Sequence, residues 1–351
     1  PRGSGERSGS GRPVHPVPEM TVLVGDIGGT NARLALYAEA SDPVAHPIAA
    51  AVYRSSDFPS LLPIIERFLN EHRDVAERGS LSRAAFGVPG PVNGRRVQTT
   101  NLPWVVDAEE VEAGLQLDRA VLLNDLEAAA HGIEQLGPND LVSLLAGDGS
   151  SGGNRAVLAA GTGLGKAGLF FDGSRYHPFA SEGGHAGFAP ETVLEVDLLR
   201  FLQGRIQGRV SWERVVSGRA IPDLLAFLAE REGRPLPTWL TEPSPPSDPS
   251  AMISAAALDG SCDLCRQTLD LFARLYGSAA GNFALELLAT GGLYLAGGIA
   301  PQILPILLET SAFAEGFQQK GRLSPALVRT PVHVVTTPHL ARLGLLRALT
   351  R

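Results

Sequence analysis

The chain has 351 residues, of which 44% are hydrophobic and 19% are charged, and its formal net charge is −7. This length favours about two domains with sizeable cores, and the composition argues against extensive disorder. The negative charge makes a nucleic-acid-binding protein unexpected, and the sequence has no run of about 18 apolar residues that would predict a membrane span.

The first twenty residues differ from the rest. They are rich in Gly, Ser, Arg and Pro, lack apolar periodicity, and begin with PRGS, which is typical of a protease-site remnant. We therefore predict that residues 1–20 are a tag or disordered segment and that Met20 is the native start. No hydrophobic signal region follows, so we expect a cytoplasmic protein.

The first half of the chain alternates strand and helix patterns. Residues 21–38, TVLVGDIGGTNARLALYA, predict a strand, a glycine turn and a second strand. A helix is expected over 60–72 and a strand over 82–88, ending in the loop 89–94. Residues 119–125 predict a buried strand, and 126–136 a helix. This alternation indicates an α/β fold.

The second half repeats the opening pattern. Residues 156–171, AVLAAGTGLGKAGLFF, again predict an apolar strand, a glycine turn with a threonine, and a strand, which suggests a duplicated architecture. Helices are expected over 193–288, interrupted by an exposed Pro/Ser-rich loop at 232–250. Residues 291–307 predict a strand, a glycine turn and a helix opened by Pro301. A strand at 331–337 and a helix at 340–350 complete the prediction.

The two glycine turns are candidate phosphate-binding sites. Glycine lets the backbone approach a ligand, and successive N–H groups in such a turn can converge on an anion, with a threonine hydroxyl as a further donor. Asp26, at the end of the first strand, could hold Mg²⁺ through water. The alternative is an ordinary tight hairpin whose aspartate caps the turn. The residues of the two turns are Gly28, Gly29, Thr30 and Asn31, and Gly161, Thr162 and Gly163.

The chain has two cysteines, Cys262 and Cys265, in a C-x-x-C pattern that is expected to lie in a helix. A zinc site would need two more ligands nearby, and none is visible. We expect two reduced, partly buried thiols, as suits a reducing cytosol.

Several separated motifs resemble those of the bacterial glucokinase family, within the hexokinase, actin and Hsp70 ATPase superfamily. The resemblance extends from Val22 to the C-terminus. It implies ATP-dependent phosphorylation of glucose at its 6-hydroxyl, and two RNase-H-like α/β domains that flank a central cleft. The motifs, in chain order, are GDIGGTNARLAL, GVPGPVNG, TNLPW, LLNDLEA, GTGLG, EGGHAGFAP, ERVVSG, GGLYLAGGIAP and KGR.

The resemblance also implies roles for individual residues. Asp125 matches the catalytic base, although a helix cap is the alternative interpretation of an aspartate at this position. Gly297 and Gly298 match the adenosine loop, where the alternative is a tight strand–helix turn. The positions that match sugar ligands are Asn101, Asn124, Glu182, His185 and Glu213.

The predicted domains follow from the same resemblance. A small α/β domain is expected to comprise residues 21–135 and 336–351, and a large one residues 136–335. Glucose and ATP with Mg²⁺ are the expected ligands. The chain could form a homodimer, but the sequence does not determine its oligomeric state. Gly187 stands where the family often has an acidic residue, so this chain lacks a carboxylate that could support the His185 side chain.

Two other functions stay open. The chain could be a kinase for another hexose or for an N-acetylhexosamine, although the cysteine-rich zinc motif usual in that wider group is absent. It could also be a non-catalytic sugar sensor, but only about twenty residues precede the first hairpin, with no helix-turn-helix pattern. The phosphoryl donor could be ATP, ADP or polyphosphate.

Overall fold

The computed structural model of the chain describes residues 20–39, 46–76, 80–99, 102–149, 152–206, 208–241 and 247–350. Internal contacts divide the chain into two units, Pro1–Leu122 and Leu123–Arg351. The segment 1–20 lies outside the described residues except for Met20, and Asn101 lies outside them as well.

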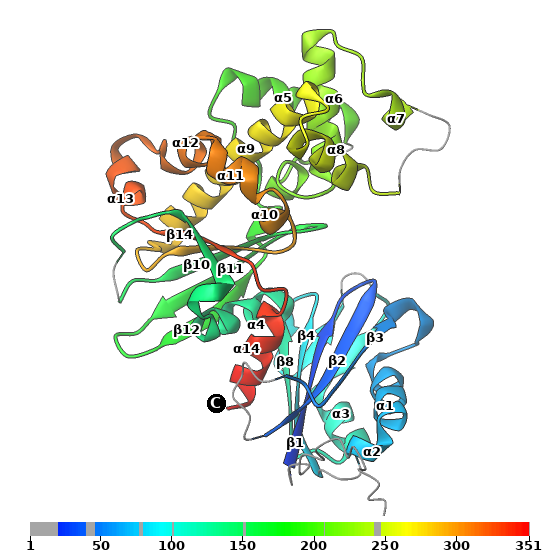
Figure 1. Ribbon diagram of the computed structural model, residues 1–351. Helices are drawn as coiled ribbons and strands as arrows, with labels where there is room; N and C mark the ends of the chain where they lie inside the picture. Colours follow the sequence, from blue (N-terminus) through cyan, green and yellow to red (C-terminus); the bar gives the residue numbers. More distant parts are fainter. Residues whose placement is uncertain are drawn as a thin grey trace, which may run out of the picture. The chain divides into compact units, whose positions relative to one another are not determined.

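The first unit is built on a five-stranded sheet with the strand order β3-β2-β1-β4-β8 (Figure 1). β1 pairs antiparallel with β2 and parallel with β4, and β2 pairs antiparallel with β3. The predicted strand–turn–strand at 21–38 is therefore confirmed as the centre of this sheet. The strands are β1 (Met20–Ile27), β2 (Asn31–Ala38), β3 (Ala49–Arg54), β4 (Ser80–Val88) and β8 (Arg119–Asn124).

Helix α1 closes the core of this unit. Its apolar residues recur at helical spacing, and Leu61, Ile64, Ile65 and Phe68 are all buried. A small three-stranded sheet, β5-β6-β7, carries further core residues. The remaining elements of the unit are α1 (Leu61–Glu71), α2 (Arg73–Ala76), β5 (Val92–Asn93), β6 (Arg96–Gln98), β7 (Val105–Asp107) and α3 (Ala108–Leu115).

The second unit repeats the plan in a six-stranded sheet with the order β12-β11-β10-β13-β14-β9. β10 pairs antiparallel with β11 and parallel with β13, as β1 does with β2 and β4. The duplicated, RNase-H-like α/β architecture is thus confirmed. The strands are β9 (Leu141–Leu145), β10 (Arg155–Ala160), β11 (Leu164–Phe171), β12 (Tyr176–Ser181), β13 (Leu293–Ala296) and β14 (Val332–Val335).

Helices cover both faces of this second sheet. On one face, Leu126 of α4 lies against Gly165 of β11, and on the other Phe283 and Leu287 of α9 lie against Lys166 and Gly168. Neighbouring strand residues point to opposite faces, so the alternation assigns the helices to the two sides. The helices are α4 (Asp125–Gly132), α5 (Val193–Arg205), α6 (Ala220–Glu232), α7 (Thr238–Thr241), α8 (Pro249–Leu258), α9 (Asp263–Leu287), α10 (Ile299–Gln302), α11 (Leu304–Glu309), α12 (Ala312–Gln318), α13 (Ser324–Val328) and α14 (Leu340–Leu349).

The division between the two units falls within β8. Leu122 is the last residue of the first unit, and α4 and α14 both belong to the second unit. The physical reason is the close packing of α4 on α14, which are drawn side by side in Figure 1, and of α4 on β10, β11 and β12.

Two details of the second unit could not be read from the sequence. The helix after β13 begins at Ile299, not at Pro301, and it breaks at Ile303 before α11 resumes with Pro305 in its first turn. Proline is tolerated in a first turn because its missing N–H has no helical acceptor there. β9 and β12, which were not predicted, lie at the two ends of the sheet order.

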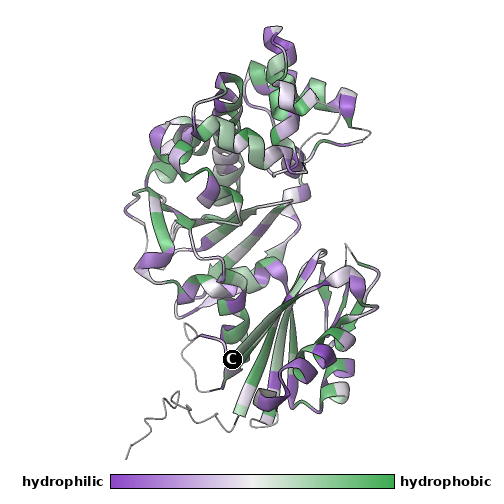
Figure 2. Cartoon of the chain, turned by 45° about the vertical axis from the view of Figure 1, so that its right-hand side comes forward, coloured by the Kyte–Doolittle hydropathy of each residue, from purple (hydrophilic) through white to green (hydrophobic). Residues whose placement is uncertain are grey.

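Hydrophobic residues are concentrated in the strands of the sheets. Figure 2 shows the strands mostly in green, whereas purple residues gather on helices and connecting segments. Among the described residues, no helix is both long and apolar enough to cross a membrane.

Replacing Gly344 by alanine tests the α4–α14 contact. An added Cβ would lie 1.7 Å from the carbonyl oxygen of Ala128, so the two helices would have to separate. We expect Gly344→Ala to lower the free energy of unfolding by roughly 1–3 kcal/mol in urea titrations. The control is Gly204→Ala in α5, where a Cβ meets nothing within 4 Å and helix propensity should improve. Equal effects of the two substitutions would contradict this account.

Candidate functional site

The first glycine turn is a tight hairpin between β1 and β2. Gly28 N–H donates to the carbonyl of Asn31 over 2.8 Å, which leaves Gly29 and Thr30 at the tip. Ser55 fixes that tip from outside, because its N–H donates to Thr30 O and its hydroxyl to Gly28 O. The turn is thus held in one conformation by β3 and the segment after it, as an anion-binding backbone requires.

Asp26 lies at the base of this hairpin, directly across from Arg33 in the β1–β2 register. Its Oδ2 is 3.6 Å from Arg33 Nη1, and its side chain is 35% exposed. Burial raises the pKa of the Asp26 carboxyl, and the Arg33 guanidinium opposes that rise. A partly desolvated carboxylate beside a backbone turn is a suitable partner for a hydrated cation.

The second glycine turn, between β10 and β11, is fixed by a separate segment of the chain. Gly161 N–H donates to Gly163 O, and Gly218 N–H donates to Gly161 O over 2.8 Å. Glu213 accepts a hydrogen bond from Leu164 N–H at 3.1 Å. A Cβ on Gly163 would come within 2.5 Å of the same Glu213 oxygen, so only glycine allows this approach.

A pocket of about 640 Å³ opens beside the second turn. Gly161 and Thr162 line one part of it, and Gly298 with the start of α10 lines another. Residues predicted from two motifs more than a hundred positions apart therefore meet in one concave site. The lining as a whole comprises Gly161, Thr162, Gly218, Arg219, Ile221, Pro222, Ser247, Asp248, Pro249, Ser250, Ala251, Ser254, Gly298, Ile299 and Gln302.

Gly297 has a structural role that Gly298 does not share. Its φ is +83°, and a Cβ there would lie 2.3 Å from the carbonyl oxygen of Ala160 at the end of β10. Both facts require glycine. Gly297 thus meets the steric requirement of a tight strand–helix turn, whereas Gly298 lines the pocket.

Asn124 and Asp125 begin helix α4, and their roles at the helix end are different. Asn124 is the N-cap, since its Oδ1 accepts from Leu126 N–H at 2.9 Å and from Glu127 N–H at 3.4 Å. Asp125 is the first helical residue and its Oδ1 accepts from Leu126 N–H at 2.9 Å. The N-cap position belongs to Asn124, and Asp125 accepts from the same Leu126 N–H within the first turn. The positive end of a helix stabilises a carboxylate at this position.

Glu182 precedes a single turn of 3₁₀ helix, Gly183–His185, and His185 is the last residue of that turn. The Nε2 of His185 is 3.9 Å from Oε2 of Glu182, and both side chains are more than half exposed. Arg209 donates to the carbonyl of His185 at 2.6 Å, and Trp212 N–H donates to Ala186 O at 2.9 Å. The loop thus presents two polar side chains together and is held beside the segment that carries Glu213.

Within the second unit, the structure brings several of the predicted residues together. Glu213 contacts the second hairpin, and the Gly161–Thr162 turn shares a pocket with Gly298, all within the second unit. Asp26 and the first hairpin belong to the first unit, and Asn101 lies outside the described residues.

Sequence reasoning missed the pocket residues at 247–251. It placed residues 247–250 in an exposed loop, but Ser247–Ala251 line the pocket, and Ser250 Oγ donates to Gly218 O. A local signal was available, because Asp248 caps α8 and accepts from Ala251 N–H, with Pro249 as the first helical residue. Asp-Pro-Ser is a typical start of a helix, not the middle of a loop.

The two cysteines lie at the start of helix α9. Cys262 is the N-cap of α9 and Cys265 is buried within it, as the helical interpretation expected, and both thiols are unpaired. Burial raises the pKa of the Cys265 thiol, which disfavours the reactive thiolate. Among the described residues, no three His, Cys, Asp or Glu side chains cluster as metal ligands.

Comparison with known proteins identifies the family. A sequence profile of the glucokinase family matches residues 23–351. The chain is 41% identical over 339 residues to a glucokinase of Trichormus variabilis, with 93% of this chain and 98% of the relative covered. It is 40% identical over 343 residues to a glucokinase of Synechocystis sp., with 93% and 96% covered. A solved glucokinase from an Antarctic psychrotroph is 33% identical, with a TM-score of 0.79 over 94% of this chain and 98% of the other. The chain belongs to the glucokinase family.

Proposed function

We propose that this member of the glucokinase family transfers the γ-phosphoryl group of ATP to the 6-hydroxyl of D-glucose, giving glucose 6-phosphate and ADP. The observation that carries the proposal is the pocket in which the Gly161–Thr162 turn meets Gly298. Its volume of about 640 Å³ is in the range of small-molecule and cofactor sites. Its lining combines backbone N–H groups with small side chains, which suits a nucleotide.

We assign phosphate binding to the residues of the two glycine turns, each within its own unit, and adenosine binding to the pocket at Gly298. The turn at Gly161–Gly163 offers backbone donors and the exposed Thr162 hydroxyl, and the turn at Gly28–Asn31 offers the same groups. Phosphoryl transfer depends mainly on positioning and charge neutralisation, so rigid backbone donors suit this chemistry.

We assign the sugar to polar side chains of the second unit and to Asn101. Carboxylate, imidazole and amide groups can pair with adjacent hydroxyls, and Glu182 and His185 lie within 3.9 Å of one another on one loop. A site that bonds each hydroxyl rejects sugars that lack one. The proposed sugar ligands in the described chain are Asn124, Asp125, Glu182, His185 and Glu213.

Asp125 is the proposed general base. Its carboxylate accepts the proton of the glucose 6-hydroxyl while the O6–Pγ bond forms and the bond from Pγ to the β-phosphate oxygen breaks. ADP leaves with the electron pair of that bond. The start of α4 favours the charged carboxylate that this role requires.

Mg²⁺ fits the residues at the base of the first hairpin. Mg²⁺ in nucleotide sites keeps several waters and needs only one or two carboxylates besides the phosphates. Asp26 supplies one half-buried carboxylate, and we propose that it holds the ion through water. The ion would neutralise phosphate charge during transfer.

We place the reaction in the cytoplasm, where ATP is available. The unpaired thiols of Cys262 and Cys265 would stay reduced in that compartment.

A coupled assay that crosses phosphoryl donors with sugars tests the proposed function. We expect ATP with glucose to give the highest kcat/KM among ATP, ADP and polyphosphate combined with glucose, fructose, mannose and N-acetylglucosamine. Turnover with fructose or an N-acetylhexosamine as fast as with glucose would contradict the substrate assignment. Sugar binding without turnover for any donor would favour a sensor.

Replacing Asp125 by asparagine tests the base. We expect Asp125→Asn to lower kcat by about 10²–10⁴-fold, because the hydroxyl proton has no acceptor, while the Kd for glucose changes little. The matched control is Asp263→Asn, which alters the first residue of α9 as Asp125→Asn alters that of α4. Normal turnover of Asp125→Asn would remove this residue from the role.

Replacing Asp26 by asparagine tests the cost of its partly buried charge. Because burial raises its pKa in the folded state, the ionised carboxylate destabilises the fold above the unfolded pKa of about 3.9. Asp26→Asn should therefore raise the thermal midpoint at pH 7, and the gain should vanish as the pH falls through the raised pKa towards the unfolded value. Turnover should fall at the same time.

The control for this pH profile is Asp118→Asn, at an exposed position of the first unit. It should leave the profile unchanged. An Asp26→Asn protein that is less stable than the parent at pH 7 would show that the Arg33 contact outweighs the burial of the charge.

A further inference from the structure

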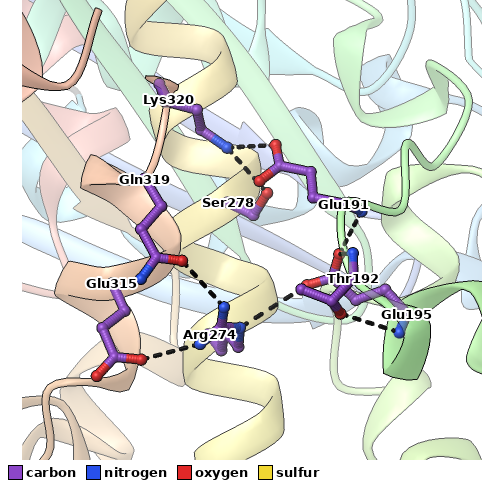
Figure 3. Close-up of polar contacts among 8 residues, drawn as sticks. All are labelled: Glu191, Thr192, Glu195, Arg274, Ser278, Glu315, Gln319 and Lys320. Atoms are coloured by element: carbon purple, nitrogen blue, oxygen red, sulfur yellow. Dashed lines mark hydrogen bonds and ion pairs between the residues drawn. The ribbon is translucent and has the colours of Figure 1, made fainter. Parts of the chain in front are cut away.

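Lys320 is a buried charged residue that the proposed mechanism does not use. It opens the KGR stretch, directly after α12, and its side chain is only 5% exposed. Its Nζ donates to Oε1 of Glu191 at 2.6 Å and to Oγ of Ser278 in α9 at 3.2 Å (Figure 3). A lysine this deeply buried is uncommon, and it is tolerated here because its ammonium has these two partners.

Glu191 is held at both its main chain and its side chain. While its carboxylate binds Lys320, its N–H donates to Oε2 of Glu195, which also accepts from Thr192 N–H. Glu195 is itself buried and completes a capping box with Thr192 at the start of α5. Figure 3 shows these contacts converging between α9, the end of α12 and the start of α5.

The segment that ends at Glu191 begins at Glu182. Between the two, Trp212 N–H donates to Ala186 O and Phe188 N–H donates to Val210 O. The ring of Phe188 lies against that of Trp212 with the centroids 5.1 Å apart. Trp212 immediately precedes Glu213. A shift of Glu191 would therefore be transmitted along the segment to both groups of proposed sugar ligands.

We propose that Lys320 is a positioning residue for the hexose, which acts by anchoring Glu191 and so fixing the 182–191 segment that carries Glu182 and His185. This inference rests on the proposed function, because it takes these two side chains to be sugar ligands. An apolar pair could replace Lys320 and Glu191 with little loss of stability, but it would lack the directed hydrogen bond that fixes the side chain at position 191. The pair therefore contributes mainly to geometry.

The test compares Lys320→Met and Glu191→Gln with the control Glu315→Gln. Glu315 pairs with Arg274 in the same network, and its side chain is 43% exposed, close to the 38% of Glu191, but it joins α12 to α9 and does not touch the 182–191 segment. We expect both Lys320→Met and Glu191→Gln to raise the glucose Kd in calorimetric titration by about five-fold or more. The KM for ATP should stay the same, and Glu315→Gln should leave the glucose Kd within about two-fold of the parent value.

The double variant Lys320→Met/Glu191→Gln should bind glucose about as weakly as either single variant, because both remove one contact. A glucose Kd unchanged in Glu191→Gln and Lys320→Met, with only the thermal midpoint lowered, overturns the inference. If Lys320→Met fails to fold, Glu191→Gln alone decides the outcome. The glucose Kd of Glu182→Gln is measured in the same way. If it is also unchanged, the proposed sugar site is wrong. If it is raised while Lys320→Met and Glu191→Gln bind normally, only the role proposed for Lys320 is wrong.

Discussion

The site of the second unit depends on how closely other segments approach the turn between β10 and β11. Gly218 N–H donates to the carbonyl of Gly161, and Glu213 accepts from Leu164 N–H on the other side of the same turn. The carboxylate oxygen of Glu213 would be only 2.5 Å from a Cβ on Gly163. Any side chain at that position would separate Glu213 from the turn, so the glycine is required for contact between the two elements.

This contact links two functions that are separate in the sequence. Gly161–Gly163 is the proposed phosphate turn, and Glu213 is a proposed sugar ligand, yet one hydrogen bond joins them. If the turn binds phosphate as proposed, a change in its conformation would directly displace the carboxylate of Glu213, a proposed sugar ligand. Such direct contact is the physical basis on which the occupancy of one site can alter affinity at the other.

Local patterns predicted the fold well, because hairpins and amphipathic helices are encoded over short stretches. The strand–turn–strand at 21–38, its copy at 156–171 and the helix α1 all lie where periodicity placed them. The order of the strands in each sheet comes from the structure and was not predicted from the sequence. Contacts between segments far apart in the chain cannot be predicted in this way. The boundary after Leu122 is set by the packing of α4 on α14, two helices about two hundred residues apart.

The candidate site, too, could be predicted only where its residues form a local pattern. The glycine-rich turns could be recognised in the sequence. Ser247–Ala251, which line the pocket, could not, because the surrounding stretch has the composition of a loop. Asn124 was predicted as a sugar ligand, and the structure shows that it is the N-cap of α4, which the sequence analysis did not predict. The side-chain oxygen that caps the helix fixes the amide in place, so the same bonds that begin α4 also orient Asn124 beside Asp125. In this way a helix end supplies a rigid frame for the proposed base, and the precision of the chemistry depends on ordinary secondary-structure hydrogen bonds.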